Sequence, residues 1–211
     1  MIVREGLRSL LQAEAGIKVV GEAQTGRQAV QLTKELRPDV LVMDIAMPLL
    51  NGLEATRQIL KSVPATKVLI LSAHSDDVEQ VIGLGAAGYL LKQTSLEDLS
   101  KAIRGAHKGN KFFSPTIARR FRHHDRKLPD RKEHLSKRVP RPTSRELEAL
   151  QLIAEGKANK QTAAELGLSI KMVEKHRQNL MAKLNIHEIS GLTRYAIAAG
   201  IVESSVQLTI R

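Results

Sequence analysis

Residues 169–185 read S-I-K-M-V-E-K-H-R-Q-N-L-M-A-K-L-N, and this stretch decides how the C-terminal third of the chain is interpreted. Ser169 suits a helix N-cap, because its hydroxyl can accept a hydrogen bond from one of the first free backbone N–H groups. Apolar side chains recur behind it at roughly helical spacing and form one stripe, made of Ile170, Val173, Leu180 and Leu184. An amphipathic helix is therefore predicted to begin after Ser169.

The other faces of this helix carry basic and amide side chains, namely Lys171, Lys175, His176, Arg177, Gln178 and Asn179. Lysine and arginine contact DNA phosphates, whereas glutamine and asparagine can hydrogen-bond base edges in the major groove. Taken alone, the pattern also fits an ordinary amphipathic surface helix. The residues upstream decide between these two interpretations.

Upstream, residues 159–166 (N-K-Q-T-A-A-E-L) read as a short helix, and Gly167 and Leu168 form a tight connection to Ser169. Two short helices joined by a turn of three or four residues that contains glycine form a helix-turn-helix. Two further helices flank this pair. One is predicted from a capping box at 143–146 to about residue 155, and the other over 188–199.

From Thr143 to about Val202 the sequence resembles the LuxR-type four-helix DNA-binding domain almost without gaps. The resemblance implies that residues 169–184 form the recognition helix. It implies base reading by Glu174, Lys175 and Gln178, and contacts to the DNA backbone by Lys171, His176, Arg177 and Asn179. Met172 stands where the family usually has threonine, and Thr162 stands where a buried isoleucine is usual.

The first 107 residues alternate between predicted strands and helices. Strands are expected at 17–23, 40–44, 67–73 and 88–91, and helices at 3–14, 26–36, 52–61, 76–84 and 95–107. The runs V-L-V-M and V-L-I-L are continuously apolar, which is typical of strands buried on both faces of a parallel sheet. The alternation predicts a doubly wound α/β sheet, followed by an all-α domain.

Three polar residues end successive predicted strands: Asp44, Ser72 and Lys92. In open α/β sheets, ligands bind outside the carboxyl ends of the strands, so these side chains should converge on one rim. A carboxylate, a hydroxyl and an ammonium suit phosphoryl transfer, with the aspartate as acceptor and the other two bonding the arriving oxygens. Singly, each could be a loop cap, a turn residue or a surface lysine.

This part of the chain resembles the receiver domain of two-component response regulators. The matching text is V-L-V-M-D-I-A-M-P-L-L-N-G-L-E-A, L-I-L-S-A and G-A-A-G-Y-L-L-K, and the whole chain resembles a NarL/FixJ-type regulator. The resemblance implies phosphorylation of Asp44, with Ser72 and Lys92 binding the phosphate. It implies an aromatic switch at Tyr89, which could equally be a core residue. The backbone carbonyl of Ala46 would join Asp44 as a Mg²⁺ ligand.

The chain departs from the receiver pattern at its start, M-I-V-R-E-G-L-R, which already reads as the first helix. The family begins with a strand that ends in two acids, and these acids supply the remaining Mg²⁺ ligands. That strand lies in the middle of the family's sheet, so its loss should leave two neighbours unpaired, at about 1–3 kcal/mol for each buried polar group. A late start codon, a decaying gene copy and a genuine short form would each explain the absence.

Composition supports the division into parts. The chain has 211 residues, a formal net charge of +11 and no cysteine, which fits a reducing cytoplasm. No apolar run approaches the ~20 residues that a membrane helix needs. Residues 1–107 (receiver) balance twelve basic against twelve acidic residues, whereas 108–142 hold twelve against three. The segment 108–142 is interpreted as a basic linker before the DNA-binding domain, 143–211. It could add salt-sensitive phosphate attraction or be merely solvated.

The sequence thus predicts a DNA-binding transcription regulator of a phosphorelay rather than an enzyme. Expected partners are double-stranded DNA, a cognate histidine kinase and a second copy in a homodimer on DNA, with no membrane. The alternative is a phosphorylation-independent DNA-binding regulator whose truncated receiver is an interaction module. An aspartyl phosphatase is disfavoured, because such sites place a second aspartate where Ala46 stands.

Overall fold

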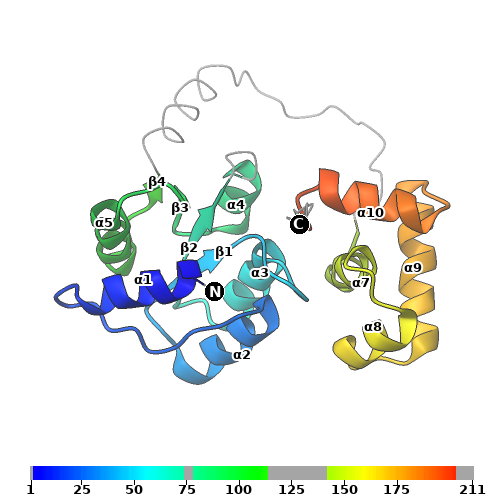
Figure 1. The fold of residues 1–211 in the computed structure, drawn as a ribbon, viewed down its shortest axis with the longest axis horizontal. Helices are drawn as coiled ribbons and strands as arrows, with labels where there is room; N and C mark the ends of the chain where they lie inside the picture. The colour runs from blue at the N-terminus through cyan, green and yellow to red at the C-terminus, as the bar shows by residue number, and fades with distance from the viewer. Residues whose placement is uncertain (1, 74–77, 114–141, 203–211) are drawn as a thin grey trace, which may run out of the picture.

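The computed structural model describes residues 2–73, 78–113 and 142–202, and Figure 1 shows them as two domains. The sheet domain (residues 2–113) contains α1 (Ile2–Gln12), α2 (Gly26–Leu36), β1 (Val40–Asp44), α3 (Gly52–Ser62), β2 (Lys67–Ser72), α4 (Val78–Leu84), β3 (Gly88–Leu91), α5 (Leu96–His107) and β4 (Phe112–Phe113). The helical domain (residues 142–202) contains α7 (Ser144–Ala154), α8 (Asn159–Leu166), α9 (Ile170–Leu184) and α10 (Ile189–Ala198).

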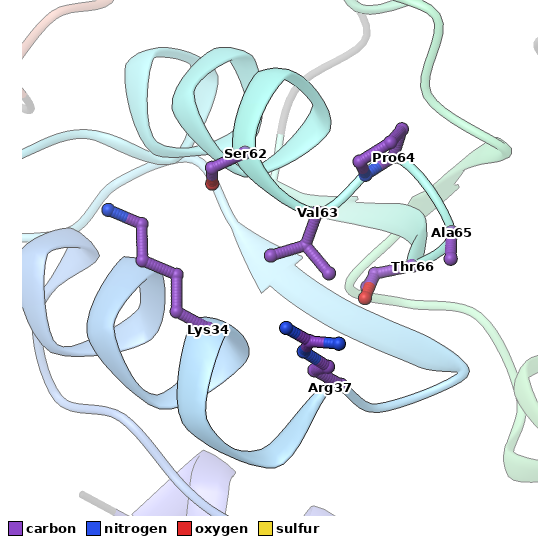
Figure 2. A pocket seen from close by; sticks show the side chains of 7 residues that line it. All are labelled: Lys34, Arg37, Ser62, Val63, Pro64, Ala65 and Thr66. Carbon is purple, nitrogen blue, oxygen red and sulfur yellow. The ribbon is translucent and has the colours of Figure 1, made fainter.

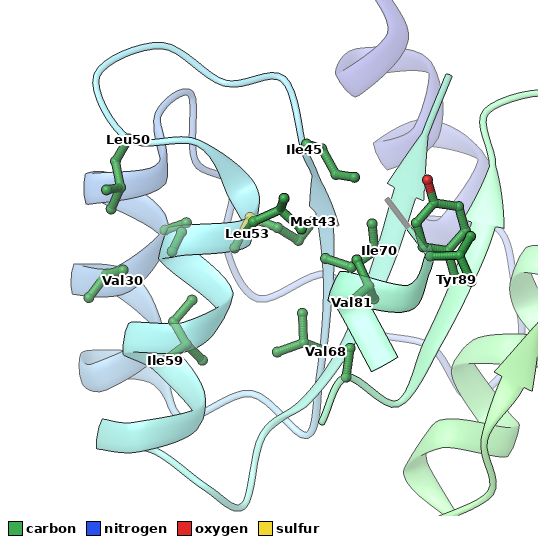
Figure 3. Close-up of a cluster of buried hydrophobic side chains, with 14 residues drawn as sticks. Val30, Met43, Ile45, Leu50, Leu53, Ile59, Val68, Ile70, Val81 and Tyr89 are labelled. Carbon is green, nitrogen blue, oxygen red and sulfur yellow. The ribbon is translucent and has the colours of Figure 1, made fainter. Parts of the chain in front are cut away.

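The sheet has four parallel strands in the order β1-β2-β3-β4, so β1 forms one edge. Helices cover both of its faces, which confirms the doubly wound α/β prediction. One cluster of buried side chains includes Met43, Ile59, Ile70 and Tyr89, between the sheet and α2, α3 and α4 (Figure 3). A second cluster joins Leu69 and Leu90 to α5 on the opposite face.

The strand predicted over residues 17–23 is wrong, because these residues have no strand conformation in the structure. Strand β1, which follows them, pairs with β2 alone. A strand is stabilised by hydrogen bonds to a neighbour, and none of the described strands lies beside residues 17–23.

Strand β4 was not predicted. Phe112 and Phe113 pair with Gly88 and Tyr89 of β3, so the sheet continues past residue 107 into the segment interpreted as linker. A two-residue strand is too short to produce a periodic pattern. Most of the predicted linker, like the first residues of the helix predicted over 76–84, lies outside the described residues.

The helical domain is organised by local caps. Thr143 and Glu146 form the predicted capping box at the start of α7. Glu146 is buried and accepts hydrogen bonds from Lys183 Nζ at 2.6 Å and from the Thr143 N–H at 2.7 Å. Burial disfavours its ionised form, but these hydrogen bonds outweigh burial and lower the pKa of Glu146.

Two small apolar clusters fill this domain. One joins Leu152 of α7 to Val173 of α9, and the other joins Leu150 of α7 to Leu180 of α9 and Leu192 of α10. Every helix therefore contributes to a core. None of the helices in the part of the chain that the structure describes is both long and apolar enough to cross a membrane.

Candidate functional site

The structure brings the three strand-end residues of the sheet domain to one edge. Asp44 pairs in register with Leu71, so Ser72 follows directly beside it, and Ser72 pairs with Leu91, so Lys92 follows in turn. Lys92 Nζ lies 2.7 Å from Asp44 Oδ2. The Lys92 N–H donates to the Ser72 carbonyl at 2.8 Å, which ties the ends of β2 and β3 together.

Asp44 is partly open to solvent, with 35% of its side chain exposed. Its Oδ1 accepts a hydrogen bond from the Ala46 N–H at 3.2 Å. Helix α3 begins against the same point, because a Cβ at Gly52 would come within 1.9 Å of the Asp44 carbonyl oxygen. A reachable carboxylate therefore lies beside a cation, which is an arrangement that stabilises added negative charge.

Ser72 and Tyr89 differ from Asp44 in exposure. Ser72 is buried at the last position of β2, and Tyr89 is completely buried in the cluster of Figure 3, near Ile70 and Val81. Tyr89 therefore packs as a core residue in this state, as the alternative interpretation expected.

Receiver domains generally bind Mg²⁺ at the phosphorylation site, but the described residues here do not fit one. Asp44 is the carboxylate at the ends of β1, β2 and β3, and it is engaged with Lys92. Within the described ranges, no group of three or more histidine, cysteine, aspartate or glutamate residues could hold a metal. Mg²⁺ requires near-octahedral oxygen coordination, which Asp44 and a carbonyl of Ala46 do not supply alone.

A small cavity of about 310 Å³ lies near the amino ends of β1 and β2, opposite the strand ends that carry Asp44, Ser72 and Lys92. Figure 2 shows Lys34 of α2 and Arg37, the C-cap that follows α2, facing residues 62–66, which precede β2. None of the predicted site residues lines it.

The helix-turn-helix forms as predicted. Gly167 ends α8 with φ 63°, in the left-handed conformation that glycine adopts without strain. The Ser169 hydroxyl accepts the Met172 N–H at 3.2 Å, which caps α9. Asn185 ends α9 with φ 52°. These caps fix both ends of the predicted recognition helix.

One face of α9 is exposed and carries most of the predicted DNA-contacting residues. Lys171, Lys175, Gln178 and Asn179 are exposed, and their spacing of three and four residues places them on a single side. Met172 shares this face. Glu174 and His176 flank it and are half-buried. Two cations and two amides on one exposed helix face suit a DNA major groove.

Arg177 lies elsewhere. It is four residues after Val173 and three before Leu180, both fully buried, and its own Nε is buried without a hydrogen-bond partner in the described structure. The prediction that Ile170 belongs to the apolar stripe is wrong, because 45% of Ile170 is exposed at the first turn. Thr162 is fully buried, and its hydroxyl has no hydrogen-bond partner among the described residues.

Sequence reasoning missed the residues that join the two domains. The Gln151 side chain of α7 donates to the Met47 carbonyl at 2.8 Å and accepts the Asn51 N–H at 2.6 Å. Between these points, the Leu49 N–H donates to Glu155 Oε1 at 3.0 Å. The loop that follows Asp44 is therefore hydrogen-bonded to α7 along its length. About a hundred residues separate the partners, so no local pattern could reveal them.

Leu49 also enters the helical domain. Its side chain packs against the cluster that contains Ala149, Leu152 and Val173. Its backbone is left-handed, with φ 66°, a conformation that costs a non-glycine residue about 1–2 kcal/mol. Contacts in the folded protein must compensate for that cost.

A buried carboxylate extends this interface. Glu148 of α7 accepts hydrogen bonds from Arg27 of α2 at 3.2 Å and from Gln58 of α3 at 2.9 Å. Glu148, Gln151 and Glu155 share one face of α7. Helix α7 thus lies between α3 of the sheet domain and α9, as Figure 1 shows.

Comparisons with known proteins agree with this geometry. A family model of the response regulator receiver domain matches residues 1–104, and one of the luxR family of bacterial regulatory proteins matches residues 143–196. Response regulator protein VraR of Staphylococcus aureus is 34% identical over 204 residues, which are 96% of this chain and 94% of that protein.

Two solved structures are similar in fold and sequence. A LuxR-family two-component response regulator from Aurantimonas is 36% identical with a TM-score of 0.56, covering 59% of this chain and 90% of its own. The response regulator RcsB in complex with DNA is 27% identical with a TM-score of 0.54, covering 92% of each chain. This chain therefore belongs to the NarL/FixJ-type two-component response regulators, DNA-binding transcription regulators that join a receiver domain to a LuxR-type helix-turn-helix domain.

Proposed function

We propose that phosphorylation of Asp44 by a partner histidine kinase controls DNA binding by this regulator. An Asp44 carboxylate oxygen attacks the phosphorus of a phosphohistidine, so a P–O bond forms, the P–N bond breaks and the histidine leaves with a proton from solvent. The exposure of Asp44 and the 2.7 Å contact with Lys92 Nζ support this role. A cation at that distance offsets the charge that gathers on the transferred oxygens.

Phosphorylation would change the balance of charge at this edge. An acyl phosphate carries more negative charge than the carboxylate it replaces, so the Lys92 ammonium is expected to move to the phosphoryl oxygens. Ser72 ends the neighbouring strand and is the proposed hydroxyl donor to the same group. Tyr89 is the proposed switch residue, which requires its ring to leave the present packing.

The observation that carries the proposal is the attachment of the loop after Asp44 to the helical domain. Gln151 bonds this loop at Met47 and at Asn51, and Leu49 packs in the cluster that contains Val173 of α9. A rearrangement of residues 45–51 would therefore act directly on these contacts between the two domains. Phosphorylation can therefore bias how firmly α7, and α9 behind it, is held.

DNA recognition is proposed for the exposed face of α9, with Lys171, Lys175, Gln178 and Asn179 in contact with DNA and Glu174 and His176 at its borders. Arg177 requires a change of rotamer to reach a phosphate. A symmetric dimer would place two such helices in half-sites about one helical turn apart. The exposed Ile189 and Ile197 on α10 support a dimer contact there.

The test joins phosphorylation to DNA affinity. The protein is incubated with acetyl phosphate, with and without Mg²⁺, and followed by intact mass and by DNA binding. Asp44→Ala should lose the adduct and the change in DNA affinity. The control is Asp39→Asn, which removes the carboxylate just before the first residue of β1 and should retain both. Gln151→Ala should keep the adduct and lose much of the affinity change.

A second candidate function is regulation without phosphate, favoured by the lack of fit to Mg²⁺. In that case the sheet domain acts as an interaction module. DNA affinity that neither acetyl phosphate nor Asp44→Ala alters would support this candidate and contradict the first.

A further inference from the structure

An exposed apolar side chain stands at the third residue of α9. Met172 is 47% exposed, although methionine is usually a core residue. Its backbone N–H donates to the Ser169 hydroxyl at 3.2 Å and to the Ser169 carbonyl at 3.0 Å, so the helix cap fixes where this residue lies. A single exposed apolar side chain is common on protein surfaces, so it indicates a binding site only together with its surroundings.

The surroundings of Met172 on the helix surface are cationic and polar. Lys175 and Asn179 follow it by three and seven residues, so they lie on the same side of α9, and both are exposed. Charged residues are depleted from the core of protein–protein interfaces, so this side is poorly suited to an apolar protein partner. The DNA major groove fits better, because it presents mostly polar base edges together with the apolar C5-methyl group of thymine.

Ile170 provides a comparison within the same turn of α9. It is 45% exposed, which is close to the exposure of Met172. Two residues turn an α-helix by about 200°, so the two side chains lie on nearly opposite sides. Ile170 shares its side with Arg177, seven residues further on, whose Nε is buried. Of these two exposed apolar residues, Met172 is therefore the one that lies among the exposed cations and amides.

We propose that Met172 contacts the C5-methyl group of a thymine in the operator and thereby selects thymine at one position of each half-site. This inference rests on the proposed function, in which the exposed face of α9 enters the major groove. The N-terminal residues of a recognition helix contact the base edges, and Met172 is one of them. A lysine or an amide cannot replace this contact, because it would leave its polar end against an apolar methyl group.

The geometry of the helix also limits where the thymine lies. An α-helix rises about 1.5 Å per residue, so Met172 stands about 4.5 Å along the axis from Lys175. Successive base pairs are about 3.4 Å apart. The thymine that Met172 contacts is therefore within about two base pairs of the position at which Lys175→Ala relaxes specificity. Burial of the single methyl group corresponds to about a fourfold change in affinity.

The test compares thymine with deoxyuridine, which forms the same base pair but lacks the methyl group. The full chain, with and without acetyl phosphate, first selects its preferred duplexes from a randomised library, and each thymine of the selected site is then replaced singly. One replacement in each half-site should weaken binding about fourfold. Met172→Gln, which keeps the length of the side chain, should bind both duplexes equally. Met172→Leu should retain a preference for thymine of about twofold or more.

Two variants of the same helix serve as controls. Ile170→Ala should keep both affinity and the preference for thymine, and Lys175→Ala should bind more weakly but keep that preference. Sequence-specific binding without any deoxyuridine-sensitive thymine, or a sensitivity that persists in Met172→Gln, would overturn the proposal and leave the proposed function intact. Failure of the full chain to select any sequence would instead contradict the proposed function, and this proposal with it.

Discussion

The two domains differ in how far along the sequence their backbone groups find hydrogen-bond partners. In the helical domain, side chains within three residues cap α7 and α9, and each helix adds to a closed core. In the sheet domain, helices form equally well, but among the described strands β1 pairs with β2 alone. A helix satisfies its backbone within four residues, whereas a strand depends on a partner distant in sequence. The comparison teaches that a strand depends more than a helix does on what the fold places beside it.

The largest expected effect tests the closed core of the helical domain. Leu180→Ala removes a fully buried side chain and should cost about 2–5 kcal/mol in the free energy of unfolding. Ile170→Ala on the same helix is the control and should cost much less, because Ile170 is exposed. Urea denaturation followed by circular dichroism measures both. Similar costs for the two variants would mean that the first turn of α9 packs more tightly than described.

The next effect compares a buried ion pair with an exposed one. Glu146→Gln weakens charged hydrogen bonds at a buried site and should cost about 1.5–3 kcal/mol. Because the pKa of Glu146 is lowered by folding, its contribution is present above pH 4.5 and is lost as the pH falls through the lowered pKa. Urea denaturation between pH 3 and pH 7 measures this.

The control for that prediction lies in the sheet domain. Glu97 accepts a hydrogen bond from Lys101 at 2.6 Å on the exposed face of α5. Glu97→Gln should leave the unfolding midpoint unchanged, since surface ion pairs are screened by water. A loss as large as that of Glu146→Gln would show that burial does not separate the two pairs.

A third prediction concerns DNA rather than stability. Lys175→Ala on the exposed face of α9 should weaken operator binding by about 1–3 kcal/mol if Lys175 reads a base, and should relax specificity at that position. Lys101→Ala, an exposed lysine of the sheet domain, is the control and should change little. Fluorescence anisotropy at several salt concentrations checks both. Intact affinity and sequence preference in Lys175→Ala would place the recognition surface elsewhere.

The smallest effect is a matched pair across the domains. Thr56 of α3 and Thr162 of α8 are both fully buried, and neither hydroxyl has a hydrogen-bond partner in the part of the chain that the structure describes. Thr56→Val and Thr162→Val each remove that hydroxyl at nearly constant volume and should stabilise the protein by about 1 kcal/mol. Calorimetry should show two unfolding transitions, one shifted by Thr56→Val and the other shifted by Thr162→Val. If both changes shift the same transition, the domains unfold as one unit and the comparison between them weakens.

Much of this structure was predictable from local signals. The capping box at Thr143, the cap at Ser169 and the bounds of α2 were predicted because each depends on neighbours in the sequence. The contact between Asp44 and Lys92 followed from the rule that parallel strands end at one edge. Their roles in phosphoryl transfer remain predictions.

What was missed depends on distant partners. Residues 17–23 have the composition of a strand, but composition cannot supply a neighbour. Ile170 was predicted in the apolar stripe but is exposed, and Arg177 was predicted on an outer face but its Nε is buried. The ends and borders of an apolar stripe are set by which surfaces surround the helix. The DNA contact of Arg177 stays a prediction. Leu49 and Gln151 carried no local signal, since their contacts join separate domains.

The contact between Asn51 and Gln151 spans 100 residues, and this separation has a consequence for synthesis. At about 5–20 residues per second, a ribosome needs roughly 5–20 s to make the intervening chain. The sheet domain can fold during this interval, with Leu49 still without the apolar cluster that later receives it. The interface must then form by docking of two folded surfaces. A nascent chain therefore passes through a period in which the loop beside Asp44 is open to chaperones before the DNA-binding domain exists.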